Sequence, residues 1–524
     1  FISSCNKGDN IKPNILFIMS DDHAYQAISA YDDRLIQTPN IDRIADEGIL
    51  FTNASVTNSI CAPSRAVILT GKHSHINGKI DNIAKFDDSQ MTFPQLFKTA
   101  GYQTAMFGKL HFGNNPKGID DFLILPGQGD YINPKFLGKD RDTIITGYVT
   151  DVITDLTLDW FKNKRDKDKP FLTFYLHKAP HRAWWPSPEK FAEFYNKKFP
   201  EPETLFDDYS NRGTAAKTAE MNLLTHMQYM QDSKVRPSVF EKMKNVEPKI
   251  VYARGDGTFF EPSSNSFNDR YNRANDEQKK KYDVILNKIS QDFETNWPKM
   301  NTKQKMQWKF QRYMQDYLAT ISSVDDNVGR VLDYLDETGL DKNTIVVYTS
   351  DQGFYLGEHG WFDKRFIYDE SFKTPLMIKW PNQIKPGTTN EEMVQNLDFA
   401  QTFLEAAMID APKDMQGKSL IPLLKGNSDK WNRESVYYHY YEYPSVHMAK
   451  RHYGIVSKDY KLVHFYFDVD EWELYDRKND PNEMNNVYND PNYADVVVKL
   501  KEELKELRIK YKDSEELDKS FLYN

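Results

Sequence analysis

Four apolar segments of the chain each end in polar side chains that can titrate or bind a metal. The segments are NILFIMS from Asn14, GYQTAMFGKLHFG (101–113), PFLTFYLHKAPHRAWWP (170–186) and TIVVYTSDQG (344–353). The polar residues at their ends are Asp21, Asp22, Lys109, His111, His177, His181, Asp351 and Gln352. Two pairs of these, Asp21/Asp22 and Asp351/Gln352, offer only oxygen ligands, which suit Ca²⁺ or Mg²⁺, whereas zinc favours His or Cys. The pattern predicts an active site with an oxygen-only metal site.

The elements that must position these side chains can be predicted from hydrophobic spacing. The apolar segments themselves predict short buried strands. Helical spacing predicts a helix over 40–48, with Asn40 as its N-cap and Gly48 at its end. Further helices are expected around 66–69 and over 312–340. Strands that alternate with helices therefore predict an α/β fold.

The order of these elements also predicts where the polar side chains meet. Alternating strands and helices form a mostly parallel sheet with helices on both faces. Ligands bind such sheets beyond the carboxyl ends of the strands. The four polar strand ends should therefore lie together at one edge of the sheet.

The chain of 524 residues is long enough for one large domain and a second unit. We expect a tether over 1–12 and a catalytic domain over 13–425. A polar, charged stretch over 187–312 predicts an insertion of irregular helices and loops. From residue 426 the sequence is aromatic with strand-like alternation and ends in a charged helix over 495–510. This predicts a smaller C-terminal α+β domain with an antiparallel sheet and a packed helix over 426–524.

Charge and cysteine content exclude several classes of protein. A formal net charge of −9 argues against a nucleic-acid-binding protein with a broad basic face. Two cysteines cannot make a disulfide framework. No apolar run reaches the length of a membrane-spanning helix.

The first five residues, FISSC, are similar to the end of a bacterial lipoprotein signal. On this interpretation Cys5 is lipidated and the next residues form a short tether. The expected location is then extracytoplasmic, in the periplasm or on the cell surface, with the lipid as the only membrane contact. A cysteine in a frayed terminus is the alternative.

Cys61 stands in a distinctive context, Cys61-Ala-Pro-Ser-Arg65. A lone cysteine is more often a small buried hydrophobic residue than a reactive group. This segment nevertheless resembles the Cys-x-Pro-Ser-Arg motif of type I sulfatases, and 101–111 resembles their second motif. The resemblance extends from 14 to about 480 and is weakest in the insertion. It implies an alkaline-phosphatase-like fold, and it implies that a maturation enzyme oxidises Cys61 to formylglycine. A hydrated aldehyde supplies one hydroxyl to attack sulfur and another to release sulfate.

The same resemblance implies roles for the other polar residues. Asp21, Asp22, Asp351 and Gln352 would bind Ca²⁺ together with residue 61, although the family often has Asn where Gln352 stands. Arg65 would hold the aldehyde hydrate, and Lys109 and His111 would form the family's Lys-x-His pair, with His111 as base. His181 and Lys364 would bind sulfate, with His181 as the acid. No firm role follows for His73, His75, His177 or Lys178, which could lie beside the site or on the surface.

The segments 350–376 and 177–191 are most similar to bacterial N-acetylglucosamine-6-sulfatases, which act on heparin and heparan sulfate. This implies a sulfated mono- or oligosaccharide as substrate. Asp363 and Arg365 would then bind ring hydroxyls through directional hydrogen bonds. His447 or His452 would reach the N-substituent, and Trp184 or Trp185 would stack on the sugar. Surface salt bridges and packing are the alternatives.

Two other functions remain open from the sequence. A phosphate or phosphonate monoester hydrolase of the same superfamily is the enzymatic alternative, because phosphonate hydrolases can also use formylglycine. A non-catalytic glycan-binding lipoprotein is the other, and the set Arg65, Lys109, His111, His181 and Lys364 counts against it, since binding alone needs no such residues.

Overall fold

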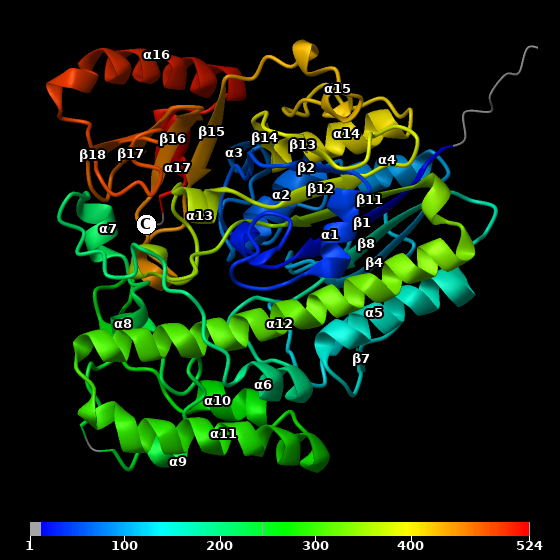
Figure 1. Cartoon of the computed structure of the whole chain (residues 1–524). Coiled ribbons are helices and arrows are strands. Elements are labelled where there is room, and N and C mark those ends of the chain that lie inside the picture. Colours follow the sequence, from blue (N-terminus) through cyan, green and yellow to red (C-terminus); the bar gives the residue numbers. More distant parts are fainter. Residues whose placement is uncertain (1–11, 244, 523–524) are drawn as a thin grey trace, which may run out of the picture.

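The computed structural model describes residues 12–243 and 245–522. Cys5 and its predicted lipidation lie outside these residues. The fold is built on a ten-stranded, mostly parallel sheet that helices cover on both faces (Figure 1). In spatial order its strands are β13 (Thr388–Asn390), β2 (Ile49–Phe51), β12 (Leu376–Lys379), β11 (Thr344–Ser350), β1 (Asn14–Ser20), β8 (Phe171–Leu176), β4 (Gln103–Lys109), β5 (Asp121–Leu125), β6 (Lys135–Gly138) and β7 (Thr143–Ile144).

The five central strands, β11-β1-β8-β4-β5, are all parallel. Four of them, β11, β1, β8 and β4, are nearly continuous runs of buried residues, as expected for strands covered on both faces. Side chains of β1 alternate between two cores. Leu16 and Ile18 lie in one core with residues of α12, and Ile15 and Phe17 lie in the other with Phe399. The predicted α/β sheet is therefore confirmed.

One face of the sheet carries α1 (Pro39–Asp46), α5 (Val149–Asp159) and α12 (Thr302–Thr338), and the other carries α2 (Cys61–Thr70), α4 (Phe93–Thr99) and α14 (Phe399–Ala406). The predicted helices over 40–48 and 66–69 are present as α1 and α2. The prediction of Asn40 as an N-cap was wrong, because α1 begins at Pro39 with Thr38 before it. Asn40 Nδ2 instead donates to Asp325 of α12 at 3.0 Å.

The insertion is more regular than expected. Besides short helices, it contains α11 (Asp276–Asn296), and α12 begins at Thr302 rather than near residue 312. Capping boxes start both helices, with Asn275 as N-cap and Gln278 as third residue of α11, and Asn301 as N-cap and Gln304 as third residue of α12. These reciprocal hydrogen bonds satisfy backbone N–H groups that a helix start otherwise leaves unpaired. Shorter elements of the insertion are α6 (Pro188–Phe194), α7 (Thr214–Thr218), α8 (Leu223–His226), α9 (Pro237–Phe240) and α10 (Asn265–Tyr271).

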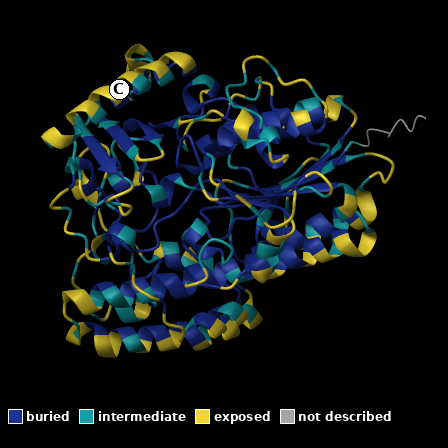
Figure 2. Cartoon of the chain, turned by 45° about the horizontal axis from the view of Figure 1, so that its top comes forward, coloured by how far each residue is buried: buried dark blue, intermediate teal, exposed yellow. Residues whose placement is uncertain are grey.

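The C-terminal part forms a second, four-stranded antiparallel sheet, with α16 (Ala494–Tyr511) packed on it (Figure 1). Its strands are β15 (Ser435–Tyr440), β16 (His452–Ser457), β17 (Tyr460–Phe465) and β18 (Glu471–Asp476). This agrees with the predicted sheet and helix, while the boundary at 425/426 stays a prediction. The central strands of the large sheet are buried, and the peripheral helices expose their outer faces (Figure 2). Within 12–243 and 245–522, no helix is both long and apolar enough to cross a bilayer.

Candidate active site

The carboxyl ends of β1 and β11 bring three carboxylates together. The strands pair in register up to Ser20 and Ser350, so Asp21, Asp22 and Asp351 follow side by side. All three are fully buried, and their carboxylate oxygens lie within 4.8 Å of one another. The backbone N–H of Asp22 donates to Asp351 Oδ1 at 3.1 Å, which fixes the two strand ends relative to each other. The predicted convergence of strand ends is therefore present.

The carboxylate cluster is chemically suited to a divalent cation. The pKa of Asp22 is raised to about 6 and that of Asp351 to about 7. Burial is the main cause, and the neighbouring carboxylate of Asp21 adds to it. Asp21 Oδ1 and Gln352 Oε1 are buried with no hydrogen-bond partner among the described residues. The Gln352 amide lies against Asp22 and Asp351, and a half-turn of the amide would present its oxygen there. An oxygen-only set of this kind fits Ca²⁺ or Mg²⁺.

Three cations surround the carboxylates. Lys364 Nζ lies 2.6 and 2.7 Å from the two oxygens of Asp22, and Lys109 binds Asp21. Arg65 binds Asp351 Oδ2 through Nε at 2.9 Å and Nη2 at 2.8 Å. Burial would raise the pKa of Asp21, but Lys109, His181 and Arg65 together outweigh it and hold the pKa well below its ordinary value. The site thus holds charges of both signs out of water, each with a partner.

Cys61 is the first residue of α2 and is fully buried. Its sulfur lies within 4.8 Å of a carboxylate oxygen of Asp21 and a ring nitrogen of His181. Burial and the Asp21 carboxylate raise the pKa of the thiol far above its ordinary value. An unmodified Cys61 is therefore a protonated thiol at neutral pH and a poor nucleophile.

His181 lies beside Cys61 and Asp21, and His111 is close enough to Lys109, Asp21 and Arg65 to feel their charges. His181 Nδ1 is 2.6 Å from the carbonyl oxygen of Arg182, so Nδ1 carries a proton, and Nε2 faces Asp22 at 3.8 Å. Burial and Lys109 lower the pKa of both His181 and His111 well below the ordinary value. His111 Nδ1 has no hydrogen-bond partner in the described part of the chain. The structure therefore brings His111 and His181 together with Arg65, Lys109 and Lys364, as predicted.

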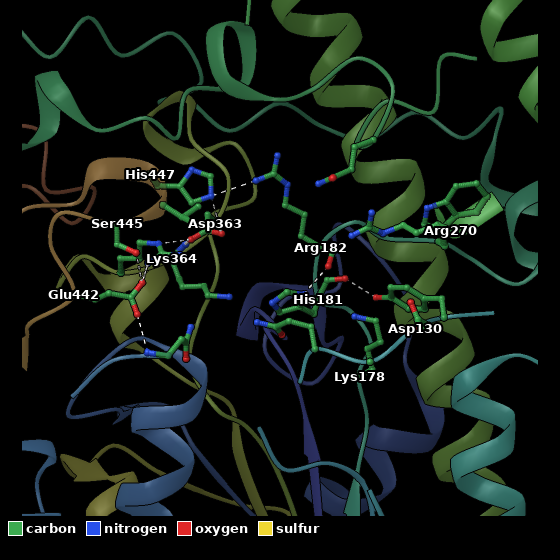
Figure 3. Close-up of a pocket in the computed structure, with 18 of the residues that line it drawn as sticks. Asp130, Lys178, His181, Arg182, Arg270, Asp363, Lys364, Glu442, Ser445 and His447 are labelled. Atoms are coloured by element: carbon green, nitrogen blue, oxygen red, sulfur yellow. Dashed lines mark hydrogen bonds and ion pairs between the residues drawn. The ribbon is translucent and has the colours of Figure 1, made fainter. Parts of the chain in front are cut away.

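A cavity of about 470 Å³ lies next to these buried charged groups, which we call its floor and of which His181 and Lys364 line it directly. Asp363, Glu442, Ser445 and His447 lie on one side, and Asp130, Lys178 and Arg270 lie on the other, with His181 and Arg182 between them (Figure 3). Arg365 also lines the cavity and belongs to the first side through its contacts with Asp363 and Glu442. On the first side Asp363 is held by Arg365 Nε at 3.0 Å, and His447 Nε2 lies 3.3 Å from Asp363 Oδ2. The cavity therefore has a floor with charges of both signs and two polar walls that differ in their residues.

Two of the predicted sugar-binding residues do not reach the cavity. Trp184 is fully buried and packs against Tyr313 with ring centroids 4.7 Å apart, so its predicted stacking role is wrong. Trp185 lines the cavity instead. His452 is also fully buried, with Nε2 accepting from the Ile367 N–H at 3.1 Å and Nδ1 donating to the Lys450 carbonyl at 2.8 Å. Both its nitrogens are used within the fold, so the predicted contact of His452 with substrate is wrong.

Sequence reasoning missed several residues of the walls. Arg182 follows His181 directly and is fixed by Asp232 of the insertion, with Nε at 2.9 Å and Nη2 at 2.6 Å from its carboxylate. Its Nη1 lies 3.3 Å from His447 Nε2. Arg270 also comes from the insertion, and no local motif marks it. Arg182 could have been singled out, because it lies within the same HKAPHRAWW stretch as His181.

The chain matches the sulfatase family over residues 13–409, and the C-terminal part of N-sulphoglucosamine sulphohydrolase over residues 357–510. It is 45% identical over 522 residues to the N-acetylglucosamine-6-O-sulfatase of Bacteroides thetaiotaomicron, covering 98% of this chain and 90% of that protein. A solved structure of a protein with its substrate D-glucosamine-2-N,6-O-disulfate is 45% identical, with a TM-score of 0.89 over 96% of this chain and 99% of that one. The phosphonate monoester hydrolase of Agrobacterium radiobacter shares the fold, at 19% identity and a TM-score of 0.63 over 95% of this chain and 96% of that one.

The family match covers most of the chain, and the structure places the residues of its two motifs, Cys61 to Arg65 and Lys109 to His111, around one carboxylate cluster. The alkaline-phosphatase-like fold predicted from the sequence is thereby confirmed. The chain belongs to the sulfatase family.

Proposed function

We propose that this protein hydrolyses the 6-O-sulfate ester of N-acetylglucosamine or N-sulfated glucosamine, as a monosaccharide or at the end of a glycosaminoglycan fragment. The observation that carries the proposal is the position of Cys61, which is buried next to Asp21 and His181, while His181 also lines a cavity whose wall holds Asp363 and Arg365. The 45% identity to an N-acetylglucosamine-6-O-sulfatase over nearly the whole chain supports the same substrate class.

The proposal includes Ca²⁺ and formylglycine. Asp21, Asp22, Asp351 and Gln352 would hold the cation, for which their buried oxygens are suited. Hydrated formylglycine at position 61 would supply the hydroxyl that attacks sulfur and a second hydroxyl whose deprotonation lets sulfate leave, and the cation would supply positive charge beside them. Arg65, one turn further along α2, is placed to orient residue 61 because Asp351 fixes its guanidinium.

The remaining floor residues bind the sulfate and move protons. Lys109 and Lys364 present two buried ammonium groups where negative charge develops on the sulfate oxygens. His181 is held by the Arg182 carbonyl through Nδ1, which leaves Nε2 to protonate the leaving sugar oxygen. A bound sulfate opposes the lowering of the His181 pKa, because a nearby anion favours the charged imidazolium. His111, kept neutral by burial and Lys109, can accept the proton that is removed as sulfate leaves.

Asp363 and Arg365 would recognise the sugar hydroxyls. Arg365 Nη1 is fixed by Tyr440 at 3.1 Å and Glu442 at 3.0 Å, and its Nε is fixed by Asp363. Such a network leaves little rotamer freedom, so ring hydroxyls meet groups that are already oriented. Glu442 and Ser445 lie on the same wall and extend the polar surface. Export as a lipoprotein through Cys5 stays a prediction.

The test is sulfate release by protein whose residue 61 has been converted, measured by ion chromatography. The substrates are N-acetylglucosamine carrying sulfate at O6 or O3, its 6-phosphate, and N-acetylgalactosamine 6-sulfate. We expect rapid release from the glucosamine 6-sulfate only. Faster release of phosphate than of sulfate would favour the phosphate or phosphonate hydrolase, and release from none of them would favour a glycan-binding protein.

A further inference from the structure

Two cations on the wall opposite Asp363 and Arg365 have no acidic partner in the part of the chain that the structure describes. Lys178 is 4% exposed and makes no ion pair or hydrogen bond through its ammonium group with any residue that the structure describes. Its Nζ makes a cation–π contact with Tyr131, 4.7 Å from the centre of the ring. Arg270 donates from Nη1 to the Ser266 carbonyl at 2.6 Å and forms no salt bridge within the described residues. Both line the cavity (Figure 3).

The acidic residues nearby are already engaged. Asp130 lies 3.1 Å from Arg273, and the guanidinium of Arg273 also donates to two backbone carbonyls. Asp232 is bound at both oxygens by Arg182. Burial, Lys109 and Arg270 lower the pKa of Lys178 to about 7, because a desolvated ammonium beside other cations is unfavourable. An anion bound between Lys178 and Arg270 would relieve this repulsion.

The proposed substrate supplies a position for such an anion. In a pyranose ring, C5 carries C6 and is flanked by C4 on one side and by the ring oxygen, followed by C1, on the other. With the 6-sulfate on the cavity floor and the C4 hydroxyl side toward Asp363 and Arg365, the C1 side faces the opposite wall. Lys178 and Arg270 lie on that wall (Figure 3).

We propose that Lys178 and Arg270 form a second anion subsite, separate from the sulfate site on the floor, which binds an acidic group on the C1 side of the 6-sulfated sugar. Two groups have this chemistry, the carboxylate of a uronate linked through C1 and an N-sulfate on C2. The inference rests on the proposed function and deepens it, since the insertion that supplies Arg270 would select substrates with a second negative charge.

The experiment compares kcat/KM on four substrates. They are N-acetylglucosamine 6-sulfate, its N-sulfated counterpart, a disaccharide in which the N-acetylated 6-sulfated sugar is linked to a uronate, and the same disaccharide with the uronate carboxyl reduced to an alcohol. The variants are Lys178→Met and Arg270→Gln, with Arg270→Lys retaining the charge. Arg141→Gln is the matched control, because Arg141 is exposed and lies outside the cavity.

The measured quantity is the preference for a doubly anionic substrate, defined as its kcat/KM divided by that of the matched singly anionic substrate. We expect Lys178→Met and Arg270→Gln each to lower this ratio by about 10-fold, which corresponds to the loss of one charged hydrogen bond. A fall confined to the uronate disaccharide identifies the carboxylate, and one confined to the N-sulfated sugar identifies the N-sulfate. Arg270→Lys should retain part of the ratio, and Arg141→Gln all of it.

A second measurement separates binding from chemistry. Binding is measured by calorimetry on Cys61→Ala protein, which cannot turn over. Adding Lys178→Met or Arg270→Gln to this protein should lower its affinity for the doubly anionic ligand by about the same factor as the kcat/KM ratio. Equal effects on singly and doubly anionic ligands would overturn the subsite while leaving the proposed sulfatase function intact. If the parent protein neither cleaves nor binds any 6-sulfated glucosamine, the proposed function fails and the subsite fails with it.

Discussion

Arg65 joins the helix that carries Cys61 to the strand end that carries Asp351. Its Nε and Nη2 lie 2.9 and 2.8 Å from the same carboxylate oxygen, and its Nη1 donates to the backbone carbonyl of Lys109. One planar guanidinium therefore fixes residue 61 relative to the carboxylate cluster and to β4. A lysine ammonium is a single point and cannot span these two acceptors as the three guanidinium nitrogens do.

We expect Arg65→Lys to lower kcat/KM by about 100-fold, because small displacements of a nucleophile have effects of this size. The unfolding temperature should fall less than in Arg65→Ala, where an unpaired buried Asp351 costs about 3–5 kcal/mol. Steady-state kinetics and thermal unfolding check both. Arg330→Lys, at an exposed pair with Asp155, is the control that should change neither. A wild-type kcat/KM in Arg65→Lys would show that the simultaneous contact with Asp351 and the Lys109 carbonyl is dispensable.

Calcium should stabilise the protein measurably. Three buried carboxylates repel one another, and a cation that binds only the folded state adds about 2.7 kcal/mol at a concentration 100 times its Kd. Protein stripped with a chelator should therefore unfold at a lower temperature and release no sulfate, and Ca²⁺ should restore both. Asp351→Asn should remove most of the thermal shift. The same shift in Asp351→Asn as in the parent protein would place the bound calcium elsewhere.

The stripped protein should also lose stability as pH rises. The folded-state pKa values of Asp22 and Asp351, about 6 and about 7, lie above the ordinary value of 3.8. A carboxyl group with a raised pKa contributes its stability in the protonated form, so that contribution is present below pH about 4 and disappears as pH rises through about 6 to 7. Calcium needs the ionised groups and should bind more tightly over the same interval.

Thermal unfolding from pH 4 to pH 8, with and without Ca²⁺, checks this prediction. The difference between the two curves should grow up to about pH 7 and then level off. Asp351→Asn should show a smaller growth, because one of the two titrating groups is absent. Parallel curves across the whole range would contradict the assignment of these carboxylates as the calcium ligands.

His452 should matter for stability rather than for substrate binding. Its Nε2 accepts the Ile367 N–H inside the fold, so His452→Ala leaves a buried N–H unpaired at a cost of about 1–3 kcal/mol. We expect a lower unfolding temperature with kcat/KM per folded molecule unchanged. His447→Ala, which removes a residue of the cavity wall, should lower kcat/KM instead. A selective rise in KM for N-substituted sugars in His452→Ala would restore its predicted role.

The floor of the site could be predicted because it follows from strand order. Residues directly after parallel strands must meet at one sheet edge, which is how Asp21 and Asp351 come together although they are far apart in sequence. The walls follow no such rule. Trp184 and Trp185 are adjacent and chemically identical, and only the packing of Trp184 against Tyr313 decides which of them lines the cavity.

The helical content of the insertion was predicted too low for a different reason. Its polar composition resembles loops, yet α11 and the first turns of α12 are regular, because one buried face suffices for a helix on the surface. The Asn-x-x-Gln pairs at 275–278 and 301–304 were visible signals of helix starts. Arg270 could not have been placed in the cavity from sequence, because it lines the cavity with Asp363 only through the tertiary packing of the insertion.

The central claim is that residue 61 acts as formylglycine rather than as cysteine. Its most direct test is the mass of the tryptic peptide 44–65, isolated from protein that has been shown to release sulfate from N-acetylglucosamine 6-sulfate. We predict that this peptide has lost the sulfur of Cys61 and gained an aldehyde oxygen, and that Cys61→Ala protein is inactive. An intact thiol throughout fully active protein would contradict the account.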